Sequence, residues 1–123
     1  MVTEDARVAW VNFQAKEWKG TAVFAGAAIE ALLLWALKER AASESDREEL
    51  EKLDLTKFID RARASGLLKD RTASQLQQAK NARNLIHPGR VARDGMACDR
   101  GGALAALSGL DWVAVDLSVN VGT

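Results

Sequence analysis

The sequence predicts an all-α protein, an up-down bundle of four main helices with one short extra helix. Only one of the 123 residues is proline. In several segments apolar residues recur every three or four positions, which places them on one face of a helix. Few stretches alternate between apolar and polar residues as half-exposed strands do. The connections between the segments are short, which favours antiparallel neighbours.

Composition predicts a single soluble domain over residues 1–123. The chain is long enough to bury a core, and 48% of its residues are apolar while 28% are charged. Seventeen basic and seventeen acidic residues balance, so no overall charge attracts nucleic acid or anionic lipid. The single cysteine, Cys98, excludes an intrachain disulfide and favours a cytoplasmic location. One histidine and one cysteine cannot build a metal site unless carboxylates supply most of the ligands, and we expect no metal and no cofactor.

The first two helices are expected at about 3–19 and 22–41, with Gly20 ending the first and Thr21 capping the second. The apolar stripe of the first helix consists of Val8, Val11, Ala15 and Trp18, widened by Trp10 and Phe13. The second helix is apolar nearly all round, which predicts contact on most sides, part of it from a second subunit. Its sixteen-residue apolar run, 22–37, contains Glu30 and is shorter than the roughly 20 residues of a membrane span, so a buried core helix is predicted.

A short helical turn and three further helices complete the predicted bundle. Ser45 and Glu48 have capping-box spacing and open a short acidic turn. A third helix ends at Gly66, and its inner face consists of Leu55, Phe58, Ile59 and Ala62. A fourth begins near Asp70 or Thr72 and ends before Pro88. A fifth, about 100–117, places Leu104, Leu107, Leu110, Val113 and Leu117 at helical spacing, extended by Trp112 and Val115, and residues 118–123 are expected to form a frayed tail.

The segment Arg83–Gly89 contains the only histidine and the only proline, and it lies in the basic part of the chain. Residues 69–100 carry seven bases and three acids. Helical spacing places Lys80, Arg83, Asn84 and His87 on one face. Arginine offers a planar fork to phosphate oxygens, and histidine can exchange a proton near neutral pH. This face therefore favours phosphate chemistry.

Two interpretations of this segment stay open. RNA cleavage by transesterification works best with one base and one acid, and a single histidine supplies both only if two subunits place their motifs face to face. In the structural alternative, Arg83 pairs with Glu30, Asn84 bonds a loop backbone and His87 caps the helix. Pro88 and Gly89 are then an ordinary helix stop.

Residues 81–90, NARNLIHPGR, resemble the signature of the HEPN superfamily, closest to a poorly characterised bacterial branch with an RN-x-x-HP motif. The apolar early helix around Glu30 also resembles that group. The resemblance implies an all-α, usually homodimeric protein with the motif at the dimer interface. Many members are metal-independent endoribonucleases of toxin–antitoxin or other defence systems, whereas others are non-catalytic regulatory modules.

Carried onto this sequence, the resemblance implies His87 as acid or base, Arg83 as phosphate clamp, and Lys80, Asn84 and Arg90 as substrate-binding residues. RNA and an antitoxin-like protein are the implied partners. Three residues separate Arg83 from His87, fewer than in active members, whereas Lys80 leaves six. Lysine is a poorer phosphate fork than arginine, so Lys80 replaces it only in part.

Overall fold

The computed structural model describes residues 3–76 and 99–120, and the regular structure in these two ranges is helical, which confirms the all-α prediction. Residues 70–76 form a further helical segment between α4 and α7. The labelled helices are α1 (Thr3–Gln14), α2 (Trp18–Arg40), α3 (Glu44–Leu50), α4 (Leu55–Ala64) and α7 (Arg100–Asn120).

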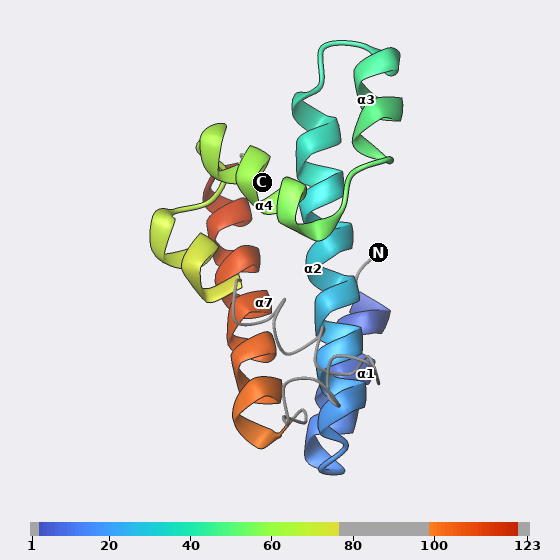
Figure 1. Ribbon diagram of the computed structural model, residues 1–123, viewed down its shortest axis with the longest axis vertical. Helices are drawn as coiled ribbons and strands as arrows, with labels where there is room; N and C mark the ends of the chain where they lie inside the picture. The colour runs from blue at the N-terminus through green and yellow to red at the C-terminus, as the bar shows by residue number, and fades with distance from the viewer. Residues whose placement is uncertain (1–2, 77–98, 121–123) are drawn as a thin grey trace, which may run out of the picture.

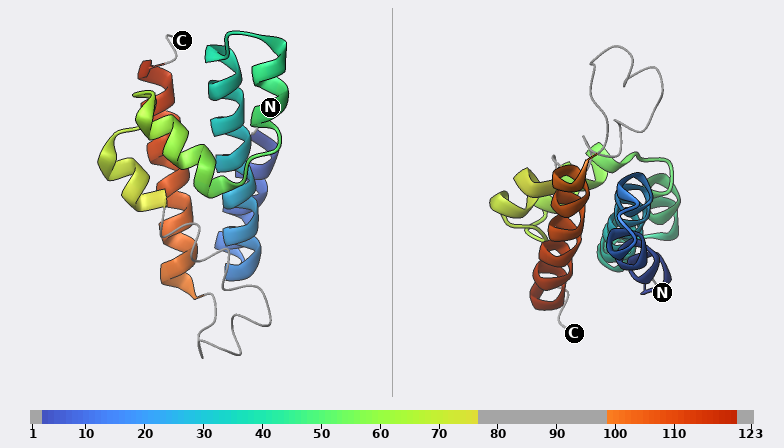
Figure 2. Two further views of the ribbon diagram at one scale, coloured as in Figure 1. Left: turned by 45° about the horizontal axis from the view of Figure 1, so that its top comes forward. Right: turned by 90° about the horizontal axis from the view of Figure 1, so that it is seen from below.

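Helix α2 is the centre of the molecule. Helix α1 folds back along its first half and α7 lies along its other side, while α1 and α7 contact each other much less (Figure 1). Helix α3 lies beside the C-terminal end of α2, and α4 passes across α2 toward α7, as the two views of Figure 2 also show. Helices α1 and α7 therefore both pack on α2 rather than mainly on each other.

The core lies between α2, α4, α7 and the segment that leads into residues 70–76. Its largest fully buried apolar side chains are Ile29, Leu33, Leu67, Leu76 and Val113. The predicted inner face of α4 is confirmed, because all four of its apolar residues are buried. Gly66 ends this helix as predicted, and its φ of +80° is a conformation that glycine adopts without strain.

The predicted junction between the first two helices is wrong. Helix α1 ends at Gln14, the chain turns at Lys16 with φ +63°, and α2 already begins at Trp18. Thr21 is not a cap, since its hydroxyl donates to the carbonyl of Glu17 at 2.9 Å from inside the helix.

Gly20 does not end a helix; it lies inside α2, where it packs against α1. An ideal Cβ at Gly20 would lie 2.2 Å from Oδ1 of Asn12, closer than any real contact. The Asn12 side chain is itself fixed, because its amide donates to the Val8 carbonyl at 2.8 Å. A glycine inside α2 therefore lets α1 approach closely.

We expect Gly20→Ala to lower the free energy of unfolding by about 1–3 kcal/mol, because the added methyl group must displace Asn12. Urea unfolding of the single variants and of Gly20→Ala combined with Asn12→Ala measures this coupling. In the Asn12→Ala background the Gly20 substitution should cost much less. An equal cost in both backgrounds would show that Asn12 is not the obstacle.

The apolar stripe predicted for the first helix is largely wrong. Ala9 is its fully buried residue, whereas Trp10 and Val11 are 52% and 48% exposed, and Ala15 lies beyond the helix and is exposed. Phe13 stacks on Trp10 with ring centroids 6.0 Å apart and also touches Trp18 at 5.3 Å. These aromatic rings form a local cluster because α2 covers only one side of α1.

The cap of α3 also differs from the prediction. Ser43, not Ser45, is the N-cap, and its hydroxyl accepts a hydrogen bond from the Asp46 N–H at 3.2 Å. Helix α4 is capped in the same way by Asp54, whose carboxylate accepts from the Lys57 N–H at 3.0 Å. Ser45 lies inside the helix because α2 ends early enough for Ser43 to take the extended cap conformation.

Helix α7 corrects two predictions. It continues to Asn120, so residues 118–120 are helical rather than a frayed tail, and 121–123 lie outside the described residues. Val113 and Leu117 are buried as predicted, but Leu104 is 41% and Val115 53% exposed. Neighbouring helices cover one side of α7, so helical spacing alone overstated its buried face.

Candidate functional site

All five basic, amide and imidazole residues of the predicted site lie outside the described residues, as do Pro88, Cys98 and the resembling segment 81–90. These site residues are Lys80, Arg83, Asn84, His87 and Arg90. Residues 70–76 precede this segment and α7 follows it. The structure therefore describes the two helical segments that flank the predicted site in the sequence, residues 70–76 and α7.

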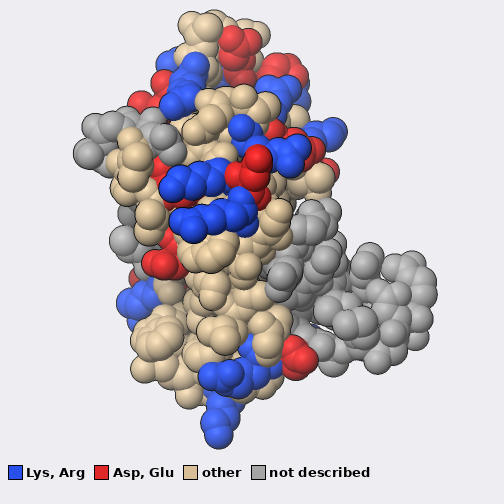
Figure 3. Space-filling view, turned by 90° about the vertical axis from the view of Figure 1, so that its left-hand side faces the viewer, with Lys and Arg blue, Asp and Glu red and all other residues tan. Residues whose placement is uncertain are grey.

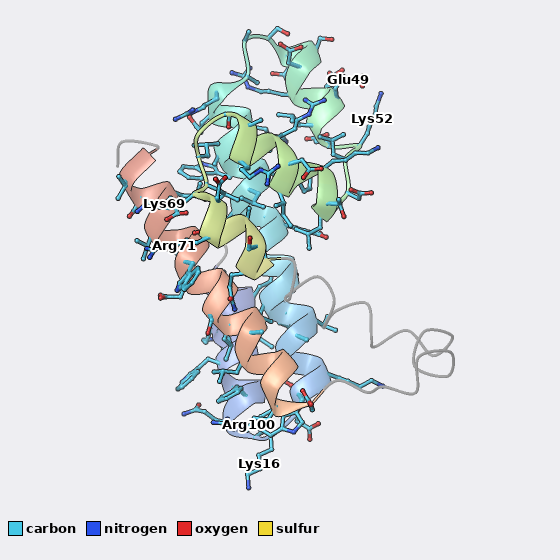
Figure 4. All side chains as sticks on the ribbon, turned by 60° about the vertical axis from the view of Figure 1, so that its left-hand side comes forward. Lys16, Glu49, Lys52, Lys69, Arg71 and Arg100 are labelled. Atoms are coloured by element: carbon cyan, nitrogen blue, oxygen red, sulfur yellow. The ribbon has the colours of Figure 1, made fainter. Side chains whose placement is uncertain are left out.

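Residues 69–76 are fixed onto α7 by three contacts. The Lys69 N–H donates to Oδ2 of Asp116 at 3.0 Å, and the Gln75 amide donates to the carbonyl of Ala105 at 3.3 Å. The Arg71 guanidinium lies 5.3 Å from the ring centroid of Trp112. Figure 4 shows Arg71 and Lys69 together beside α7. These contacts orient the chain that leads into the predicted site.

Asp116 is a structural residue that the sequence interpretation missed. It is 3% exposed although it is ionisable, and it meets the backbone that opens the segment 70–76. A signal for it exists in the sequence, since Asp116 has the helical phase of Val113 and Leu117, which both face the core. An acid at such a phase predicts a buried polar contact.

We expect Asp116→Ala to lower the free energy of unfolding by about 1–3 kcal/mol, because the Lys69 N–H loses its acceptor and the buried Asp116 side chain is truncated. Asp111→Ala is the matched control, since Asp111 is an exposed acid on the same helix. Denaturant unfolding of both variants is the measurement. Equal stability of the two variants would contradict the structural role of Asp116.

Glu30 is the one predicted site residue within the described part of the chain. It lies near the middle of α2, next to the fully buried Ile29, and is itself partly buried. Its proposed partner, Arg83, lies outside the described residues. Glu30 therefore stays a predicted structural partner, on the helix that α1, α4 and α7 all contact.

Residues 99–100, at the other end of the predicted site, are anchored too. The Asp99 carboxylate accepts from the Gly102 N–H at 2.8 Å in the first turn of α7. The Arg100 guanidinium lies 5.5 Å from the Phe13 ring centroid, which brings a cation of the basic segment onto the aromatic cluster of α1. Figure 4 shows Arg100 and Lys16 at this same end of the molecule.

Among the described residues, the pKa values that clearly depart from their usual range belong to one exposed ion pair in α1. The hydrogen bond and the charge of Arg7, whose guanidinium lies 2.7 Å from the Glu4 carboxylate, hold the pKa of Glu4 below its usual value. The same contact raises the pKa of Arg7. Because both groups are in water and one turn apart, this pair is an ordinary surface contact of α1.

Two further properties bear on function. Within residues 3–76 and 99–120, no three His, Cys, Asp or Glu side chains are grouped so that they could hold a metal ion. Helices α2 and α7 are long and apolar enough to cross a membrane by length and composition alone. The buried side chains of α2 belong to the core, and core helices of this kind meet the same criteria.

Comparisons with family models, curated proteins and solved structures find no match to this chain.

Proposed function

We propose that this chain is a HEPN-like helical bundle that acts on RNA as a homodimer, with the site at the subunit interface. The observation that carries the proposal is the segment Arg83–Pro88, which joins a fixed cation, an amide, the only histidine and the only proline. The resemblance of residues 81–90 to the HEPN signature also supports a cytoplasmic protein of a defence or toxin–antitoxin system, with RNA and an antitoxin-like protein as partners.

In this proposal, His87 from each subunit faces a shared cleft. One imidazole takes the proton of the RNA 2′-hydroxyl while the other donates a proton to the leaving 5′-oxygen. Arg83 holds the phosphate through its planar fork, and Lys80 and Arg90 add positive charge. Asn84 orients His87 or the ligand. No metal is required in this scheme because the proton transfers use side chains alone.

The described helices support the proposal because the residues just before and just after the segment that contains Arg83–Pro88 are held in place. Leu76 is fully buried at one end, and Arg100 contacts Phe13 at the other. A site that must position a phosphate within a few tenths of an ångström needs rigid elements on both sides. The buried Asp116 contact supplies part of that rigidity.

A second candidate is a non-catalytic dimerisation or regulatory module in which the motif is structural. It is favoured by apolar side chains that the described helices leave in solvent on α1 and α7: Trp10, Val11, Leu104, Val115 and Val119. Exposed apolar groups of this kind are common at subunit interfaces. In this case the protein is a dimer that does not cleave RNA.

The test is cleavage and binding of a labelled single-stranded RNA by purified protein in the presence of a chelator. Its oligomeric state is measured by analytical ultracentrifugation. We expect a dimer and RNA fragments that end in a 2′,3′-cyclic phosphate. A dimer that does not cleave would favour the regulatory module. A monomer that neither binds nor cleaves RNA would contradict both candidates.

A further inference from the structure

A groove lies between the C-terminal end of α2, the short helix α3 and the last turn of α4. Its volume is about 760 Å³, within the range of small-molecule sites. Figure 1 shows α3 beside the end of α2, on the part of the molecule that α4 crosses. The residues that line it are Leu37, Arg40, Ala41, Ala42, Asp46, Glu49, Leu50, Arg61, Ala64 and Ser65.

The groove combines an apolar surface with walls of opposite charge. Its apolar part includes Leu37 and Leu50, both buried in the core. The cations, Arg40 and Arg61, come from α2 and α4, whereas the acids come from α3. Figure 3 shows basic and acidic side chains gathered together over the upper half of the molecule. An apolar pocket with a few charged groups at its edges is the usual form of a small-ligand site.

Two of the four charged groups are already engaged. The Glu49 carboxylate lies 3.1 Å from the Lys52 ammonium, and Figure 4 shows both at the C-terminal end of α3. Arg40 donates to the Ser65 carbonyl at 2.7 Å, which fastens the end of α2 to the end of α4. Within the described part of the chain, neither Arg61 nor Asp46 forms a side-chain ion pair. One cation and one anion of the groove can therefore receive a ligand.

We propose that this groove binds a small zwitterion, a free amino acid or short peptide with both termini charged. Its carboxylate binds the Arg61 guanidinium, its ammonium binds the Asp46 carboxylate, and its apolar side chain lies against Leu37 and Leu50. Acids in the wall disfavour a phosphate or a nucleic acid here, because like charges repel. The proposal goes beyond the RNA-directed function and uses none of its residues.

The probe is the dipeptide leucyl-alanine, titrated into ¹⁵N-labelled full-length protein and followed by NMR. For a ligand of this size we expect a Kd of about 1 mM, with amide shifts concentrated in α3 and at the ends of α2 and α4. N-acetylation or C-amidation of the dipeptide should each weaken binding roughly tenfold, since each removes one charge-assisted hydrogen bond. Free leucine tests whether one residue is enough.

Matched variants test whether binding of the dipeptide depends on the charged residues of this groove or only on the overall charge of the protein. Arg61→Gln and Asp46→Asn should each weaken binding roughly tenfold. Arg63→Gln and Asp60→Asn should leave binding unchanged, because both residues line a separate cavity of about 230 Å³. Circular dichroism checks that all four variants fold.

Three results would overturn the proposal. These are no amide shifts with the dipeptide at tenfold its expected Kd, equal binding of the capped forms, and equal losses in the control variants. RNA cleavage by Arg61→Gln should match the wild type, so failure of the groove and failure of the proposed RNase are distinguished.

Discussion

His87→Ala should lower the rate of RNA cleavage at least about 100-fold, because the imidazole is the only side chain of its kind in the chain and general acid–base catalysis contributes about 10²–10⁴-fold. In a two-fold dimer each substitution removes both the acid and the base of the shared site. Single-turnover cleavage of a labelled RNA by wild type and variant is the measurement. RNA binding should fall much less than cleavage, because the cations that hold the phosphate remain.

Two controls keep this result interpretable. Arg83→Ala should weaken both binding and cleavage, whereas Arg63→Ala, at an exposed arginine on α4, should change neither. The thermal unfolding midpoint of each variant shows whether it is folded. Cleavage by His87→Ala at the wild-type rate would exclude His87 from catalysis and attribute any activity to a contaminant or another site.

Leu33→Ala should lower the free energy of unfolding by about 2–5 kcal/mol, the largest stability effect that we predict. Leu33 is fully buried near the middle of α2, the helix on which α1, α4 and α7 pack. Truncating its isobutyl side chain to a methyl group leaves a cavity that helices fixed on several sides fill only in part. Urea unfolding monitored by tryptophan fluorescence and circular dichroism measures the loss.

Leu104→Ala is the matched control for this substitution. Leu104 is 41% exposed on α7, so the same change of side chain removes far less buried surface there. We expect its effect to stay below about 1 kcal/mol, typical of surface substitutions. A similar loss for both leucines would mean that α7 is covered in solution, for example by a second subunit.

The presence of helices was predicted well, because it depends on the spacing of apolar residues within short stretches of the sequence. The near-absence of proline and the recurrence of apolar residues predicted the helices now seen as α1, α2, α4 and α7, and the inner face of α4 was correct residue by residue. Boundaries were less accurate. Gly20 was interpreted as a stop from its conformational freedom, but its role depends on Asn12, a neighbour in another helix.

Burial was predicted least well on α1 and α7. Spacing identifies which residues share a face but not how many neighbours cover that face. Trp10, Val11 and Val115 were placed in the core by spacing and are about half exposed. Spacing also did not identify Asp116, which is 3% exposed and accepts a hydrogen bond from the Lys69 backbone N–H.

The sequence by itself determined the all-α class and singled out the one segment, Arg83–Pro88, for which we propose phosphate chemistry, because both follow from residue type and short-range spacing. The tertiary structure alone decided that α2 is the shared central helix, that Asp116 fixes the chain before that segment, and that a groove of mixed charge lies beside α3. These features join residues far apart in the chain, and such contacts arise only when helices pack together.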